Sequence, residues 1–168
     1  GRLNQVVHKL ARSAGLRVPK RDPANRVLTV RELRQIEEGF ANCREALGWD
    51  HDIMVHCHWE YDVRTAIQIA EAVAPIKPLW LEDILRPDSL QVMSDFRSRI
   101  SVPVAVSEML VSADSYRQIL NSGAADYAMI DPTWVGGITA ATRLVDQAQI
   151  CNVPALMHDC TGPMTLLA

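Results

Sequence analysis

The stretch VPVAVSEMLVSADSYRQILNSGAADYAMID, residues 102–131, holds two strand-like segments with a helical segment between them. Residues 102–107 and 127–130 are short and mostly apolar on both faces. Residues 113–121 read as a helix that stops at Gly123, a residue that often ends helices. Strands that are apolar on both faces are typical of a parallel sheet covered by helices. The stretch therefore predicts one β/α/β unit of an α/β fold.

The same alternation extends in both directions from this unit, and about six β/α units can be placed along the chain. Further strands are expected at residues 16–20, 53–58, 78–82 and 153–158, and further helices at residues 3–14, 30–47, 63–74, 89–99 and 138–151. Such a chain forms either an open doubly wound sheet or a barrel. No glycine-rich phosphate-binding motif follows the first strand, and such a motif is the main sequence sign of a doubly wound sheet that binds nucleotides. Its absence argues against that architecture. We expect a partial TIM-type (β/α) barrel.

Composition narrows the classes of function. The chain has 168 residues, 48% of them hydrophobic and 22% charged, as in ordinary globular proteins. A net charge of -3 gives no basic surface for nucleic acid. The sequence contains no run of about 18 apolar residues, so no membrane-spanning helix is predicted. Four cysteines without zinc-type spacing indicate reduced thiols and a cytoplasmic location.

The limits of the chain bear on its domain organisation. Gly1 stands where an initiator Met would be expected, and the chain ends at Ala168 in the middle of an apparent helix. We therefore expect residues 1–168 to form a single, incomplete barrel domain.

Polar residues follow the predicted strands, one after another. They are Lys20, His58, Glu82, Glu108, Asp131 and His158. A single Glu in such a place is usually a helix cap, and a single His is usually structural. However, the carboxyl ends of barrel strands face the active site, and the last five residues recur at roughly the length of one β/α unit. Together they predict a catalytic site.

The residue types suggest a particular chemistry. Converging carboxylates bind Mg²⁺, which prefers oxygen ligands. An Asp beside a His orients the ring and makes it a better general base. A base beside a cation suits removal of a proton next to a carboxylate. Cys57 and Cys160 are poor candidates for a nucleophile, because each stands a residue or two from a His and Cys57 would point to the opposite face of its strand.

Four sequence strings carry a resemblance to a known family. They are Trp80-Leu81-Glu82-Asp83, Val106-Ser107-Glu108, residues 130–139 (IDPTWVGGIT) and residues 158–163 (HDCTGP). In this order they resemble the enolase superfamily, mandelate racemase/muconate lactonizing subgroup. The resemblance implies a C-terminal barrel domain without the family's capping domain and without its first and last strands. Sites of that superfamily are a known case of a Lys or His base that works with Mg²⁺, which stabilises an ene-diolate.

The resemblance also implies roles for individual residues. Glu82 and Glu108 match the second and third metal ligands, and Asp131 and His158 match a dyad in which His158 is the base. His58 matches the general acid of acid-sugar dehydratases. Lys20, after Pro19, falls near the position of a catalytic lysine. His56 stands where the family normally has the first ligand, an Asp, so Mn²⁺ or another divalent metal becomes an alternative to Mg²⁺.

The function implied is that of a lyase that removes water from a sugar acid to give a 2-keto-3-deoxy acid. A racemase or epimerase, with Lys20 and His158 on opposite faces of a 2-hydroxy acid, is one alternative. A truncated and inactive barrel is the other. The expected partner is a small carboxylate substrate, with a homo-oligomer as an option for assembly.

Overall fold

A computed structural model describes residues 26–106, 108–159 and 162, and it contains one parallel sheet with five strands in the order β1-β2-β3-β4-β5 within these residues. The strands are β1 Met54–His56, β2 Trp80–Glu82, β3 Val104–Val106, β4 Tyr127–Ile130 and β5 Ala155–Met157. The helices are α2 Val30–Leu47, α3 Val63–Val73, the short 3₁₀ helix η1 Ala74–Ile76, α4 Leu90–Arg99, α5 Ala113–Ser122 and α6 Ile138–Ile150. Sequential parallel strands joined by helices are the arrangement of a partial TIM-type barrel.

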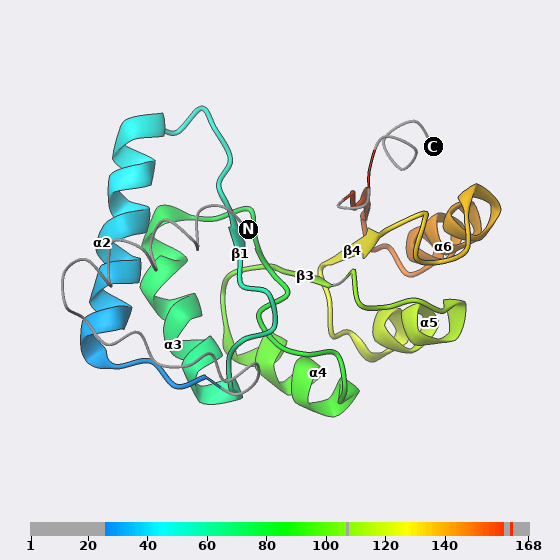
Figure 1. The fold of residues 1–168 in the computed structure, drawn as a ribbon, viewed down its shortest axis with the longest axis horizontal. Helices are drawn as coiled ribbons and strands as arrows, with labels where there is room; N and C mark the ends of the chain where they lie inside the picture. The colour runs from blue at the N-terminus through cyan, green and yellow to red at the C-terminus, as the bar shows by residue number, and fades with distance from the viewer. Residues whose placement is uncertain (1–25, 107, 160–161, 163–168) are drawn as a thin grey trace.

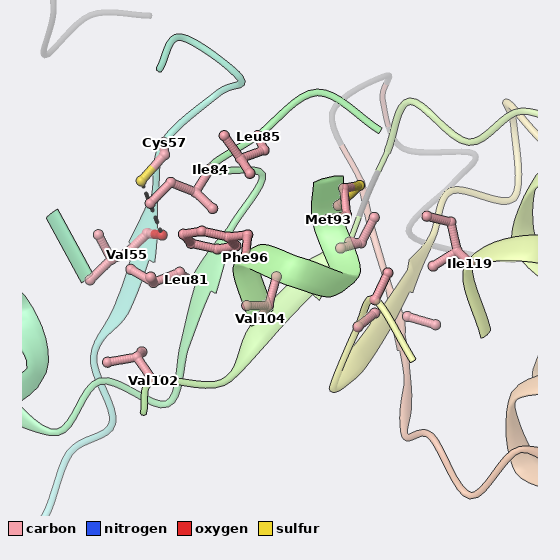
Figure 2. Close-up of a cluster of buried hydrophobic side chains, with 14 of the residues drawn as sticks. Val55, Cys57, Leu81, Ile84, Leu85, Met93, Phe96, Val102, Val104 and Ile119 are labelled. Atoms are coloured by element: carbon pink, nitrogen blue, oxygen red, sulfur yellow. Dashed lines mark hydrogen bonds between the residues drawn. The ribbon is translucent and has the colours of Figure 1, made fainter. Parts of the chain in front are cut away.

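The helices form an arc around one face of the strands (Figure 1). The main hydrophobic core lies between these two layers, and Figure 2 shows Phe96 of α4 directed toward Leu81 and Val55 of the sheet. Phe96 and Leu81 are almost fully buried, at 1% and 0% exposed. Since burial of one such side chain contributes about 1.5–3 kcal/mol, this layer fixes the strands in place.

Local sequence signals begin several of the helices. At the start of α2, Thr29 accepts a hydrogen bond from the Glu32 backbone N–H, and Glu32 accepts one from the Thr29 N–H. This reciprocal pair satisfies two donors that the helix itself leaves unused. Asp62, Ser89 and Ser112 cap α3, α4 and α5 through their side chains.

The second face of the sheet carries the polar strand ends. Trp80, Ala105 and Met129 form a smaller buried cluster there, separate from the main core. Successive residues of a strand point to opposite faces. His56 therefore lies opposite the core residue Val55, and Glu82 lies on the same face as Trp80.

The predicted elements agree with the structure except in the length of the strands. Residues 30–47 and 127–130 have the predicted bounds. The strand predicted at residues 53–58 ends at His56, because His58 has a φ of 57° and leaves the extended conformation. The strand predicted at residues 16–20, with Lys20, and the helix predicted at residues 3–14 lie outside the described residues. No helix of the described residues has the length and apolar character needed to cross a membrane.

Candidate active site

The carboxyl ends of the strands bring the predicted residues to one edge of the sheet. His56 and Glu82 end β1 and β2, and the parallel register places them directly opposite each other. Asp131 follows β4 and His158 follows β5. The His158 backbone N–H donates to the carbonyl of Ile130 over 2.8 Å, which continues the sheet up to the site.

The first group of the site is the pair His56–Glu82. The Nδ1 of His56 lies 2.6 Å from Oε1 of Glu82, and the Trp80 indole N–H donates to Oε2 over 3.2 Å. The hydrogen bond to Glu82 raises the pKa of His56. Burial raises the pKa of Glu82, but the hydrogen bonds from His56 and Trp80 outweigh it and the net pKa is lowered. Both shifts favour the charged forms of the pair.

The second group consists of His158 with a carboxylate on each side. Its Nδ1 lies 3.0 Å from Oδ2 of Asp131, and its Nε2 lies 2.5 Å from Oε2 of Glu108. Glu108 and Asp131 are buried, at 7% and 1% exposed. A histidine can donate to two carboxylates at once only as an imidazolium. In this arrangement Nε2 is occupied, so His158 can accept a proton only after Glu108 has moved away.

The turn after β4 holds Asp131 rigidly. Its Oδ1 accepts hydrogen bonds from the Thr133 hydroxyl at 2.6 Å, the Thr133 N–H at 2.9 Å and the Trp134 N–H at 3.3 Å. Burial raises the pKa of Asp131, but the hydrogen bonds from Thr133 and His158 lower it further than burial raises it. Gly136 and Gly137 both have φ values near 100° in this turn (103° and 102°), a region that non-glycine residues rarely adopt.

The two groups are close enough for their charges to interact. The charge of Glu108 contributes to the raised pKa of His56, and the charge of His158 contributes to the lowered pKa of Glu82. His58 lies beside the first group, with its ring centroid 5.6 Å from that of His56. The edge thus combines a carboxylate-oriented imidazole with a second histidine–carboxylate pair, an arrangement suited to moving protons.

Cys57 stands between two histidines of this edge, yet it takes no part in the site. Its side chain points into the hydrophobic core, where Sγ contacts the Val55 carbonyl at 3.9 Å (Figure 2). Burial raises the pKa of the thiol to about 12. The predicted orientation of Cys57 toward the face opposite the histidines is confirmed, and the thiolate, the reactive form, is disfavoured there. Cys160 lies outside the described residues.

The donor atoms at the edge do not fit Mg²⁺ well. In the described part of the chain, no three His, Cys, Asp or Glu side chains are arranged to hold a metal ion. Glu82 and Glu108 are both held by histidines, and His56, at the position of the first ligand, offers a nitrogen. Magnesium requires oxygen ligands in near-ideal octahedral geometry.

Three supporting residues were not predicted from the sequence. Trp80 and Thr133 contact the site carboxylates, and Trp134 places its ring 6.5 Å from the His158 ring in an edge-on arrangement. Two signals were present in the sequence. Trp80 stands two residues before Glu82 and so shares its face, and Thr133 stands two residues after Asp131, a spacing typical of an Asx turn.

The partial barrel and the polar residues at the carboxyl ends of its strands define a class of protein. Comparison with known families gives the same class. A family model described as enolase C-terminal domain-like matches residues 3–168. The chain therefore belongs to the enolase C-terminal domain-like family.

Individual relatives bear names from acid-sugar metabolism. A D-gluconate dehydratase from Thermoproteus tenax is 30% identical over 84% of this chain and 29% of its own length. A D-xylonate dehydratase from Haloferax volcanii is 28% identical over 89% of this chain and 36% of its own length. The chain thus spans about a third of the length of these curated relatives.

Solved structures give the same picture of the fold. An enolase of the mandelate racemase subgroup from Agrobacterium tumefaciens superposes with a TM-score of 0.81 at 32% identity, over 86% of this chain and 40% of the other. A racemase from Streptomyces coelicolor, whose structure contains bound magnesium, has a TM-score of 0.74 at 23% identity, over 76% of this chain and 36% of the other. At that identity the second likeness bears on the fold alone.

Proposed function

We propose that the chain is the barrel portion of a lyase that removes water from a sugar acid. The observation that carries the proposal is His158, held at the edge of the sheet between Asp131 and Glu108. A partly buried, oriented imidazole among carboxylates suits a general base. The names of the relatives from Thermoproteus tenax and Haloferax volcanii support a sugar acid as the substrate class.

In the proposed reaction, His158 takes the proton from the carbon next to the substrate carboxylate. The electron pair of the broken C–H bond passes into an enediolate. Before this step the Glu108 side chain has to turn away from Nε2 of His158. Nε2 then loses its proton, and His158 can act as the base. Asp131 keeps the ring oriented during the transfer and stabilises the imidazolium that results.

Loss of water completes the proposed reaction. The bond to the 3-hydroxyl breaks with its electron pair, and His58 donates the proton that makes the leaving group water. The enol product then becomes a 2-keto-3-deoxy acid. Positive charge at the edge stabilises the enediolate. The His56 ring, whose pKa Glu82 raises, is one source of that charge, and a divalent cation would be another.

A racemase or epimerase is the second candidate, because the Agrobacterium tumefaciens structure is assigned to the mandelate racemase subgroup. It would use Lys20, which lies outside the described residues, together with His158. Racemisation requires exchange of the substrate proton without loss of water. The two candidates therefore differ in their products.

One experiment separates the candidates. The chain is incubated with Mn²⁺ and a panel of aldonic and aldaric acids in deuterated water, and the products are followed by proton NMR and a keto-acid assay. A keto product that disappears in His158→Asn supports the dehydratase. Deuterium exchange without a keto product would support the racemase, and no reaction with any acid would support the inactive barrel.

A further inference from the structure

We propose that Trp59 is a positioning residue, whose indole ring holds the exposed imidazole of His58 in the orientation from which it donates a proton to the departing 3-hydroxyl group. The proposal rests on the proposed function for the role of His58 as the acid. It adds the residue that keeps this acid in place.

The chain leaves β1 through two consecutive residues in the left-handed conformation. His58 and Trp59 have φ values of 57° and 56°. Residues other than glycine rarely adopt this conformation, and those that do cluster at functional sites. In an extended strand the two side chains would point to opposite faces. The left-handed turn ends this alternation and brings the two rings together, with centroids 4.3 Å apart and planes tilted by 40°.

Hydrogen bonds on both sides fix the backbone of this turn. The Trp59 N–H donates to the Asp83 carbonyl over 2.6 Å, and the Glu60 carbonyl accepts from the Arg26 N–H over 2.7 Å. Asp83 directly follows β2 and is 2% exposed. The backbone from which the indole extends is therefore tied to the sheet.

The side chain of His58 depends more on contacts between rings. It is exposed, and its ring lies 5.6 Å from the ring of His56. An exposed side chain loses rotamer freedom when it is held in one orientation. Contact with a flat aromatic ring offsets that loss. Trp59 is half-buried and supplies this contact at the shorter distance.

The orientation of His58 matters in one branch of the proposed reaction. His158 removes the substrate proton and leaves an enediolate. In deuterated water the enediolate either takes a deuteron back from His158, or its electron pair expels the 3-hydroxyl group, which receives a proton from His58 and leaves as water. Loss of the Trp59 ring therefore slows the second branch and spares the first.

The quantity that tests the proposal is the ratio of deuterium exchange to keto product, measured by NMR with a sugar acid that the wild type dehydrates. We expect this ratio to rise about tenfold or more in Trp59→Ala, because misplacing a reacting group by about 1 Å can cost about a hundredfold in rate. His58→Asn, which lacks the acid, should give a larger rise. Trp59→Phe keeps a flat ring, so its ratio should stay within about threefold of the wild type.

The matched control is Trp49→Ala. Trp49 is 66% exposed, and its ring contacts the guanidinium of Arg44 on α2. This variant should keep the wild-type ratio. A general loss of folded protein lowers exchange and product together, so it leaves the ratio unchanged. If Trp59→Ala does not fold, by circular dichroism, Trp59→Asn replaces it with the same expected rise, because Asn tolerates the left-handed conformation.

A second measurement does not require turnover. Three-bond couplings between the α and β protons of His58, assigned with His58→Asn, report whether the side chain keeps one staggered rotamer. We expect one rotamer in the wild type and in Trp59→Phe, and averaging over several in Trp59→Ala.

The proposal is overturned if Trp59→Ala has the exchange-to-product ratio of the wild type, or if the couplings of His58 are the same in both proteins. A wild type that makes no keto product would refute the proposed function. The couplings of His58 alone would then decide whether Trp59 positions its ring.

Discussion

At the scale of single residues, the side chain of His158 is held on both sides by carboxylates. Asp131, which contacts Nδ1 at 3.0 Å, is itself held by Thr133. Replacing Asp131 by Asn keeps an oxygen for the Thr133 hydroxyl but removes the charge that stabilises an imidazolium. We expect Asp131→Asn to slow deuterium exchange at the substrate carbon by about a hundredfold or more, measured by NMR.

A matched control separates this effect from a general loss of charge. Asp146 is an exposed carboxylate on α6, so Asp146→Asn should exchange deuterium at the rate of the wild type. An Asp131→Asn variant that also keeps the wild-type rate would show that Asp131 does not support the base.

Much of the candidate site could be predicted from residues alone, but its contacts could not. The resemblance to the enolase superfamily places His56 and Glu82 together as metal ligands, and the register of β1 and β2 puts the two residues opposite each other. The bond between Glu108 and His158 depends on where two loops from different strands meet, which no local pattern encodes. The catalytic and metal-binding roles of these residues stay predictions.

At the scale of elements, an ion pair ties α4 to the beginnings of β3 and β4. The Arg97 guanidinium lies 2.5 Å from Oδ1 of Asp126, and Oδ2 accepts the Val104 N–H at 2.9 Å. Burial raises the pKa of Asp126, but the hydrogen bonds from Arg97 and Val104 outweigh it, so the net pKa is lowered. At pH 7 we expect Asp126→Asn to reduce the free energy of unfolding by about 1–3 kcal/mol, measured by urea denaturation.

The same ion pair predicts a dependence on pH. A carboxyl group whose pKa is lowered in the folded state makes its full contribution to the stability of the fold at pH values above its unfolded pKa. This contribution is lost as the pH falls through the folded pKa. The difference between wild type and Asp126→Asn should therefore be full above about pH 5 and decline below about pH 4. Asp146→Asn, at an exposed residue of α6, is the control and should change stability little at any pH.

The helices could be predicted more accurately than the strands, for physical reasons. The limits of α2 are set by local signals, the Thr29 and Glu32 pair at its start and Gly48 at its end. Strand limits depend on hydrogen bonds to neighbouring strands, so apolar residues beyond the paired segment were counted in error. Val153, for example, is apolar, but it lies before β5 and its backbone N–H donates to the Ala148 carbonyl of α6.

At the scale of the whole molecule, β1 and β5 are the outer strands of the described sheet. Each pairs with one neighbour among the described residues, and each carries an exposed methionine, Met54 at 50% and Met157 at 57%. Outer strands with apolar side chains favour association between chains. We expect the 168-residue chain to self-associate, and Met157→Glu to shift it toward the monomer in sedimentation velocity measurements.

The control for this prediction is Ile150→Glu. Ile150 is 84% exposed, but it is a residue of α6 and not of an outer strand. If both variants shift the equilibrium equally, the association is a general effect of exposed apolar residues. The predictions of a homo-oligomer, of a cytoplasmic location and of residues 1–168 as one incomplete domain stay predictions.

The inward orientation of Cys57 has a practical consequence for spectroscopy. Its raised pKa and burial protect it from maleimides at neutral pH, whereas Cys43 is exposed on α2. A fluorophore attached to Cys43 would thus report on the outer layer of helices while β1, which carries His56, remains unlabelled.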